Sequence, residues 1–310
     1  MRDNTAMETG SKLRAPIVSG IFYPEDADEL TRLVQDLLER VSAEENNRIS
    51  PPPDQQLRVL FVPHASYQHI GSYLARAFHL VSQAMTIERI VLLSTVHRDF
   101  EERVWLPGFD AFRCPLADFP VDSRLIHRLN DSSSSDSSSS GSSSSGEGPF
   151  RINNIPFTEE HSQEILLPML AQTAAKATIL PLLLGQNSRE LIGHTAHALR
   201  QLQLTNDPHT LFVLSSNLSN FTDSVHAQKQ AQSFLTELGQ NSPDFLSSRR
   251  ITACGRGGLQ VVQELFHGNL TYLNLEVGRS GVIQPEQREV WYGSFAGYTP
   301  INRHTDREEL

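Results

Sequence analysis

Two histidines follow apolar runs that have the character of buried strands. His64 comes shortly after Leu57–Val62, and His97 comes shortly after Arg89–Thr95. Cys254, in the sequence ITACGRGG, is also expected at the end of a strand, before glycines that allow close backbone approach. Imidazole and thiolate are good ligands for iron, copper or zinc, so these residues are candidates for a metal site. The alternatives are a capping role for each histidine and an inert, apolar cysteine.

A second group of ionisable side chains lies in FTEEHSQEILLPML, residues 157–170. Glu160, His161 and Glu164 crowd the start of an expected helix over residues 160–176, with Thr158 as its N-cap. Acidic residues suit a helix N-terminus, which is the structural interpretation. The functional interpretation is that Glu160 or Glu164 orients His161 toward a cleft, where His161 acts as an acid–base or supporting residue.

A third apolar run, residues 210–216, ends in a polar stretch that contains Asn217 and Asn220. Two adjacent glycosylation sequons lie there, at residues 217–219 and 220–222. The N-terminal sequence MRDNTAMETGSKLRAP lacks the apolar core of a signal peptide, and two cysteines provide no disulfide framework. We therefore expect a cytoplasmic protein, in which the sequons carry no meaning. Asn217 and Asn220 are interpreted instead as one wall of a site.

Continuous apolar strands that alternate with amphipathic helices position these residues. This pattern predicts an α/β fold: a single domain with a largely parallel central sheet flanked by helices. Ligands of such sheets bind beyond the C-terminal ends of the strands, where both histidines and both asparagines are expected. Strands are predicted at 57–62, 89–95, 178–185 and 210–216, helices at 26–44, 71–82, 160–176, 188–203, 223–239 and 258–266, and antiparallel strands at 269–278 and 289–298.

The predicted domain spans residues 14–300, between a disordered tail at 1–13 and a C-terminal tail at 301–310. Residues 131–148 contain 12 serines and cannot bury apolar area, so they are predicted to be a flexible insertion. We do not interpret them as a domain boundary, because the strand–helix alternation resumes beyond them. Phosphorylation of this segment is the alternative to a plain solvated spacer.

Charge and hydropathy exclude two classes of partner. The net charge of −10 argues against a nucleic-acid-binding protein, which needs a basic face. No apolar run approaches the roughly 20 residues that span a bilayer, so no membrane association is expected. A small molecule or a peptide is the expected partner, no nucleotide cofactor is expected, and the oligomeric state is not indicated.

Five motifs, taken together and in order, resemble the Memo family, also called AmmeMemoRadiSam system protein B. They are RAPIVSGIFYP (14–24), PHASY (63–67), LLSTVH (92–97), EHSQEILLP (160–168) and Cys254-Gly255. The match extends over nearly the whole chain, from about Arg14 to Tyr298. The family is similar in fold to class III extradiol ring-cleaving dioxygenases, which use non-haem iron. The resemblance implies an iron or copper ion at His64, His97 and Cys254, and places His161 on the family's Glu-His-Ser segment.

The sequence departs from the family pattern at the third strand end. Where the family has Ser-Ser-Asp-x-x-His, this chain has Asn217 in place of the acid and Asn220 in place of the histidine. An amide cannot shuttle protons, so both catalytic positions are degenerate and ordinary dioxygenase acid–base chemistry is expected to be impaired. Glu160, Tyr67 and His69 are candidate binding residues, and His69 is a candidate substitute for the missing histidine.

Three functions remain open. The first is a metal-binding protein with a redox role, and the second is a non-catalytic protein that binds a peptide or partner in the same cleft. The third is a serine hydrolase that uses Ser162, Ser215 or Ser216. The chain has no G-x-S-x-G motif, which counts against the third function.

Overall fold

The structure is a computed structural model of the chain. It describes residues 12–45, 51–84, 86–98, 101–135, 148–221, 224–240, 253–279 and 289–301. Most of the predicted N-terminal tail, residues 136–147 of the serine-rich segment and residues 302–310 of the C-terminal tail lie outside the described residues.

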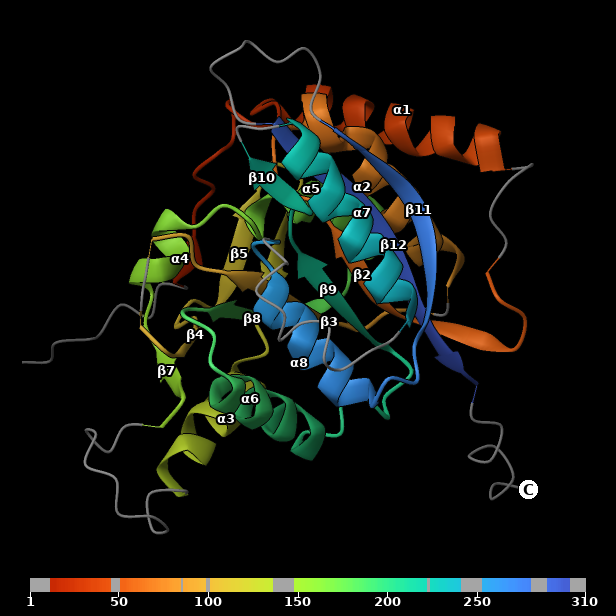
Figure 1. Cartoon of the computed structure of the whole chain (residues 1–310). Coiled ribbons are helices and arrows are strands. Elements are labelled where there is room, and N and C mark those ends of the chain that lie inside the picture. The colour runs from red at the N-terminus through yellow and green to blue at the C-terminus, as the bar shows by residue number, and fades with distance from the viewer. Residues whose placement is uncertain are drawn as a thin grey trace, which may run out of the picture.

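The chain forms a single α/β domain around a mixed sheet of nine strands (Figure 1). The strand order is β10-β12-β2-β9-β3-β8-β4-β7, and β11 pairs with β12. The strands are β2 (Gln55–Val62), β3 (Arg89–Thr95), β4 (Val104–Leu106), β7 (Phe150–Ile152), β8 (Thr178–Leu184), β9 (Thr210–Ser215), β10 (Ser219–Phe221), β11 (Thr271–Arg279) and β12 (Glu289–Pro300). The predicted parallel part is the central group β2-β9-β3-β8, and β12 and β4 flank it in antiparallel pairing.

Helices cover both faces of this sheet (Figure 1). Helices α1, α2 and α5 contact one another, and α2 packs on β2 and β12. Helix α8 packs on β3 and β9, α6 packs on α8, and α7 packs on β10 and β12. The helices are α1 (Ala27–Glu45), α2 (Tyr67–Gln83), α3 (Ser123–Ser135), α4 (Ile155–Glu159), η2 (Glu164–Leu166, a 3-10 turn), α5 (Leu167–Thr173), α6 (Arg189–Gln201), α7 (Ser224–Gln240) and α8 (Arg256–Phe266).

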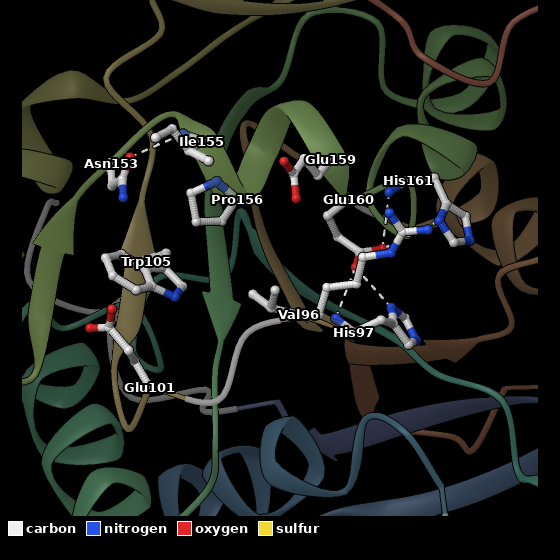
Figure 2. Close-up of a pocket in the computed structure, with 11 residues that line it drawn as sticks. Val96, His97, Glu101, Trp105, Asn153, Ile155, Pro156, Glu159, Glu160 and His161 are labelled. Atoms are coloured by element: carbon white, nitrogen blue, oxygen red, sulfur yellow. Dashed lines mark hydrogen bonds and ion pairs between the residues drawn. The ribbon is translucent and has the colours of Figure 1, made fainter.

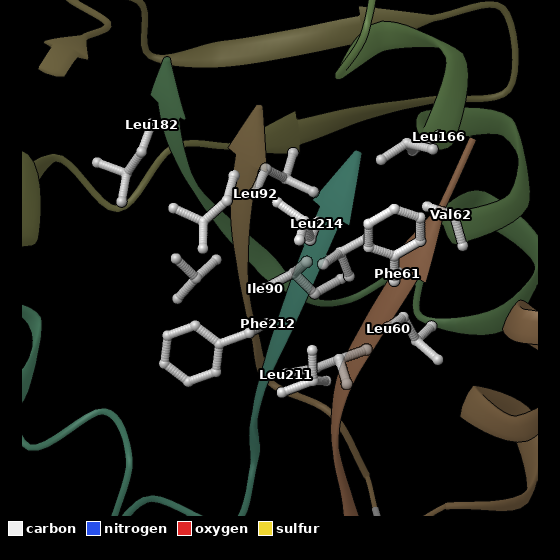
Figure 3. Packing of buried hydrophobic residues seen from close by; sticks show 14 of the residues in the cluster. Leu60, Phe61, Val62, Ile90, Leu92, Leu166, Leu182, Leu211, Phe212 and Leu214 are labelled. Carbon is white, nitrogen blue, oxygen red and sulfur yellow. The ribbon is translucent and has the colours of Figure 1, made fainter. Parts of the chain in front are cut away.

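The central strands are buried on both faces, as their continuous apolar sequences predict. All six residues of β9 are buried, and so are six of the eight residues of β2. Phe61 of β2 contacts Phe234 of α7, and Phe212 of β9 contacts Phe266 of α8. Each fully buried aromatic or leucine side chain contributes about 1.5–3 kcal/mol through loss of apolar surface from water. Figure 3 shows buried apolar side chains of β2, β9, β3 and β8 beside one another. The core therefore fixes the C-terminal ends of these strands beside one another.

One predicted helix differs from the structure. Residues 160–176 do not form a single helix, because α4 ends at Glu159 and regular structure resumes only at Glu164. Thr158 is not an N-cap: it lies inside α4, and its hydroxyl donates to the carbonyl of Ile155. Pro168 is the physical reason, since a proline deep in a helix removes a backbone donor and clashes with the preceding turn. In the structure Pro168 lies in the first turn of α5, where proline is tolerated.

Several short elements were not predicted. Strands β1 (Leu13–Arg14), β5 (Ala111–Cys114) and β6 (Ala117–Pro120) form a separate small sheet. Helix α3 continues into the serine-rich segment as far as Ser135. Among the described residues, no helix has the length and apolar character needed to cross a membrane.

Candidate metal centre

The structure brings His64, His97 and Cys254 together at the C-terminal edge of the central strands. His64 follows β2 and His97 follows β3, and these strands are the two neighbours of β9. One potential ligand atom from each of the three residues lies within 4.8 Å of the others. The rings of His64 and His97 meet edge to face, with their centroids 5.2 Å apart. The cluster could therefore hold a metal ion.

Cys254 reaches this edge from a different kind of element than predicted. It does not end a described strand but lies in the turn before α8, which starts at Arg256. The hydroxyl of Thr95 donates to the carbonyl of Cys254 over 2.8 Å, which fastens this turn to the end of β3. A Cβ at Gly255 would lie only 2.5 Å from the Cβ of Ser216. Glycine therefore lets the turn approach β9 closely enough to place the sulfur.

His64 is held by a hydroxyl that also fixes its tautomer. Nδ1 of His64 lies 2.9 Å from Oγ of Ser215, and this hydroxyl donates its proton to the carbonyl of Ser162 over 2.7 Å. Because a serine hydroxyl carries one proton, Oγ must accept the remaining bond from Nδ1–H of His64. In the neutral ring Nε2 then carries the lone pair, and it lies 3.4 Å from the sulfur of Cys254. The ring therefore presents a ligating nitrogen to the cluster.

His97 is held in the same way by a buried carboxylate. Oε2 of Glu160 lies 2.8 Å from Nδ1 of His97 and also accepts from the backbone N–H of His97. Oε1 of Glu160 accepts from the backbone N–H groups of His161 and Ser162 over 2.9 Å each. Burial alone would raise the pKa of Glu160, but these hydrogen bonds and the charge of His97 lower it to about 2. Glu160 is thus ionised. Because it binds Nδ1 of His97, the other ring nitrogen, Nε2, faces the cluster and can act as a ligand.

The cluster stabilises a negative sulfur and a positive charge beside it. Burial would raise the pKa of Cys254, but His64, His97 and Ser216 together lower it well below the ordinary thiol value. The backbone N–H of Asn217 adds a donor 3.2 Å from the sulfur. The hydrogen bond that His97 donates to the sulfur of Cys254, followed by the one that it donates to the carboxylate of Glu160, raises the pKa of His97 to about 10. A site that stabilises a proton on His97 in this way would also stabilise a metal cation.

His161 lies beside the cluster without belonging to the three-residue set. Its ring is 5.8 Å from that of His64 and is stacked on that of His97 at 6.0 Å. Phe22 meets it edge to face at 5.1 Å. Burial lowers the pKa of His161, and the carboxylate of Glu160 opposes this shift. The side chain is 29 % exposed, so it can meet a ligand.

A pocket of about 440 Å³ adjoins the cluster. Figure 2 shows His97, Glu160 and His161 at one end and Trp105 and Asn153 at the other. The volume lies in the range of small-molecule sites. A ligand in this pocket would meet the imidazoles of His97 and His161.

The two asparagines differ in what the structure describes. Oδ1 of Asn217 accepts from the backbone N–H of His64 over 3.2 Å, and its Nδ2 donates to the carbonyl of His64 over 3.4 Å. Asn217 therefore fixes the backbone of a candidate ligand. Asn220 pairs through its backbone with Val290 of β12, and its side chain lies outside the described part of the chain.

Two other candidate binding residues point elsewhere. The hydroxyl of Tyr67 donates to the carbonyl of Ile165 over 3.0 Å, and the ring is buried against Tyr23. His69 is exposed on the first turn of α2 and does not line the pocket beside the cluster. The geometry therefore gives Tyr67 a packing role and offers no contact through which His69 would replace Asn220.

The sequence identifies Glu160 and Asn217 as site residues, but not what they hold: Glu160 binds His97 and Asn217 binds the backbone of His64. Ser215 enters the sequence analysis only as a hydrolase nucleophile, although it directly precedes Ser216 and Asn217 at a strand end. Glu164, with no exposed surface, accepts hydrogen bonds from the N-terminal segment rather than facing His161. Trp105 lies on β4, a strand too short to be recognised.

Comparison with known proteins supports the resemblance to the Memo family. The sequence model of the family described as "Memo-like protein" matches residues 14–271. A MEMO1 family protein of Nitrosopumilus maritimus is 22% identical over 255 residues, which are 81% of this chain and 86% of that protein. A MEMO1 family protein of Thermotoga neapolitana is 25% identical over 268 residues, which are 82% and 88% of the two chains.

One solved structure is similar at a low level. The chain described as "Crystal structure of uncharacterized protein JW3007 from Escherichia coli K12" aligns with a TM-score of 0.47 and 12% identity, over 78% of this chain and 99% of that one. A TM-score below 0.5 adds no support to the assignment. The family match extends over most of the chain and includes all three residues of the cluster, and on this basis the chain belongs to the Memo family.

Proposed function

We propose that this protein binds iron or copper through His64, His97 and Cys254 and uses the ion in a redox reaction of a small molecule. The convergence of two imidazoles and one thiolate within 4.8 Å is the observation that carries the proposal. Sulfur and imidazole together select soft or borderline transition metals over magnesium or calcium. Three protein ligands leave positions open for a further ligand.

The surrounding groups fit such an ion. Ser215 and Glu160 each bind Nδ1 of one histidine, which leaves both Nε2 atoms to the cluster. Outer partners of this kind raise the basicity of metal ligands and fix their orientation. An iron or copper ion here would supply one-electron chemistry and polarise a bound oxygen atom.

The chain's own residues would then bind the substrate and limit its chemistry. The pocket between His97 and Trp105 would take the small molecule. His161 is the ionisable side chain at its inner end that the cluster does not use, so it is our candidate for holding a proton. Asn217 cannot ionise, and its amide is engaged by the backbone of His64. We therefore propose that ordinary dioxygenase acid–base chemistry is impaired.

A non-catalytic function of the same cleft is the alternative. In this case the cleft would bind a peptide or a protein partner, and the cluster would not hold a metal. Ile155, which is 65% exposed at the edge of the pocket, favours this alternative because it offers apolar surface to a partner. A thiolate with low pKa, such as that of Cys254, persists best in a reducing compartment, so we propose a cytoplasmic location for either function.

Metal content separates the two functions. The protein is purified without oxygen, and bound iron, copper and zinc are measured by elemental analysis before and after each metal is added. We expect about one iron or copper ion per chain, and loss of the ion in Cys254→Ser and His97→Ala. Cys114→Ala is the matched control, because Cys114 is buried in β5 and lies outside the cluster. A wild-type protein that carries no metal and binds none would refute the metal function.

The acid–base proposal has its own test. Asn220→His restores the residue that the family pattern has at this position, and turnover of catechol is compared in the two metal-loaded proteins. We expect faster ring cleavage in the variant. Equal rates would contradict the proposed impairment without affecting the metal site.

A further inference from the structure

The carboxylate of Glu164 is the most fully bonded acidic group near the metal centre. It has no exposed surface, and all its described hydrogen-bond donors come from residues 14–23. Oε1 accepts from the hydroxyl of Tyr23 over 2.7 Å and from the N–H of Val18 over 2.9 Å. Oε2 accepts from the N–H of Ile17 over 2.8 Å and pairs with Nη1 of Arg14. The donors occupy the lone pairs that a carboxylate offers.

Arg14 connects this carboxylate to the residue that holds His97. Its Nη2 donates to the carbonyl of Glu160 over 2.8 Å, and its Nε donates to the carbonyl of Phe157 over 2.9 Å. The guanidinium therefore fixes the end of α4 and the backbone of Glu160. The side chain of Glu160 in turn binds Nδ1 of His97. A continuous series of hydrogen bonds runs from Glu164 through Arg14 and Glu160 to a candidate metal ligand.

The same segment places an aromatic ring against His161. Residues 18–23 form a turn in which Phe22 N–H donates to the carbonyl of Val18 over 2.8 Å, and Gly20 adopts a positive φ of 76°. The carbonyl of Phe22 accepts from the N–H of Tyr67 over 2.8 Å. Glu164 binds both ends of this turn, at Val18 and Tyr23. It thereby sets the position of the Phe22 ring, 5.1 Å from that of His161.

Stability alone does not explain a charged pair at this place. A buried ion pair loses its hydration, and apolar residues of similar size often stabilise a protein as well or better. The pair instead fixes directions, because the planar guanidinium donates at fixed angles to four acceptors, the carboxylate of Glu164 and the carbonyls of Ala15, Phe157 and Glu160. A lysine ammonium cannot reproduce this geometry. The N-terminal motif RAPIVSGIFYP contains all the described donors to the carboxylate of Glu164.

We propose that Glu164 and Arg14 are positioning residues of the metal centre. Glu164 orients Arg14, Arg14 fixes Glu160, and Glu160 presents His97 with Nε2 free. This inference rests on the proposed metal function for its effect on affinity, but the orientation of His97 does not depend on a metal.

Two variants and two readouts test the proposal. Glu164→Gln puts an amide N–H among groups that are all donors. Arg14→Lys keeps the positive charge but loses the planar set of donors that binds Phe157, Glu160 and Glu164. The first readout is cobalt(II) affinity, followed through the thiolate–cobalt absorption. We expect a loss of about tenfold to a hundredfold, as for other outer-sphere partners of metal ligands. The matched control is Ile21→Ala, because Ile21 lies on the same turn but is 72% exposed, and we expect wild-type affinity.

The second readout needs no metal. In the metal-free protein, the Nδ1 proton of His97 hydrogen-bonded to Glu160 should give a downfield proton resonance, identified by its loss in His97→Gln. We expect this resonance to shift or broaden in Glu164→Gln and Arg14→Lys and to stay in Ile21→Ala. If Glu164→Gln does not fold, both measurements are made on Arg14→Lys alone.

The possible failures can be told apart. Wild-type protein that binds neither iron, copper nor cobalt would refute the metal function, while the resonance would still test the positioning. An unchanged resonance in folded Arg14→Lys protein, or wild-type cobalt affinity in both variants, would overturn the positioning proposal. Equal affinity losses in Arg14→Lys and Ile21→Ala would also overturn it, because they would show a general effect of disturbing the segment.

Discussion

Replacing Ser215 with alanine should weaken both the fold and metal binding, because one hydroxyl serves two buried groups. In the structure this hydroxyl accepts from Nδ1–H of His64 and donates to the carbonyl of Ser162. Both partners are buried, and each would lose its hydrogen bond. A buried polar group left without a partner costs about 1–3 kcal/mol. The free energy of unfolding of Ser215→Ala should therefore fall by about 2 kcal/mol or more.

Metal affinity should fall for a separate reason. Without the serine oxygen, the proton of His64 is free to move to Nε2, which then cannot ligate. Loss of an outer partner of a metal ligand typically costs about tenfold to a hundredfold in affinity. Cobalt(II) titration of the folded protein measures this loss, and urea denaturation of the metal-free protein measures the first effect.

Ser94 provides the matched control on the neighbouring strand β3. It has no exposed surface, and among the described residues its hydroxyl has no hydrogen-bond partner. Ser94→Ala removes an unpaired buried hydroxyl, so stability should be unchanged or higher and metal affinity should match the wild type. If Ser215→Ala behaves like Ser94→Ala in both assays, the assignment of the His64 tautomer is wrong.

Two further predictions follow from contacts in the structure. Gly255→Ala should lower the free energy of unfolding, measured by urea denaturation, by about 1–3 kcal/mol and weaken cobalt binding, because its Cβ would lie 2.5 Å from that of Ser216. Gly193→Ala in α6 is the control, because the added Cβ meets only Glu264 at 3.8 Å. This variant should raise the free energy of unfolding by about 0.5–1 kcal/mol in the same assay. Asp207→Asn should cost about 1 kcal/mol at pH 7, because the carboxylate accepts from Arg89, Thr210 and His209. Burial alone would raise the pKa of Asp207, but the hydrogen bonds outweigh burial and the pKa is lowered. The carboxylate therefore stabilises the fold above the ordinary pKa of 3.8, and this stabilisation is lost as the pH falls through the lower pKa of the folded state. Urea denaturation at pH 7 and below pH 4 tests this, and a difference between wild type and variant that does not shrink in acid would contradict it.

The sequence predicted the elements whose residues are buried continuously. Strands β3, β8 and β9 each contain an uninterrupted apolar run, and that of β2 is interrupted only by Arg58. Helices α1 and α6 have helical spacing, so local pattern and burial agree. Strands β1 and β4–β7 have only two to four residues each, and they are strands because of their partners. Their own sequences contain too few positions for a period to show, so β4, which carries Trp105 into the pocket, was missed.

Two candidate ligands, His64 and His97, were predictable because strand ends are predictable, whereas the contacts of Ser215 and Arg14 that hold them in place were not. His64 and His97 follow recognisable strands, and the order of parallel strands brings such residues together. Arg14 and Glu164 are 150 residues apart in the chain, and no local pattern connects them. The break at Glu160 could have been inferred from Pro168, eight residues into the predicted helix. That break matters for the site, because Glu160 ends α4 in an extended conformation rather than starting a helix.

Asn217 shows why the loss of an ionisable group at this strand end does not amount to loss of the site. Its side chain accepts from the N–H of His64 and donates to the carbonyl of the same residue. A carboxylate could make the first bond but not the second, since it has no proton to donate at neutral pH. Its backbone N–H donates to the sulfur of Cys254 in addition. The position that the family pattern assigns to an acid thus contacts two candidate ligands here, through groups that stay neutral at every physiological pH. Substitution by asparagine removes proton transfer at this position and retains the positioning of His64 and Cys254, which fits a protein that holds a metal more than one that needs a second base.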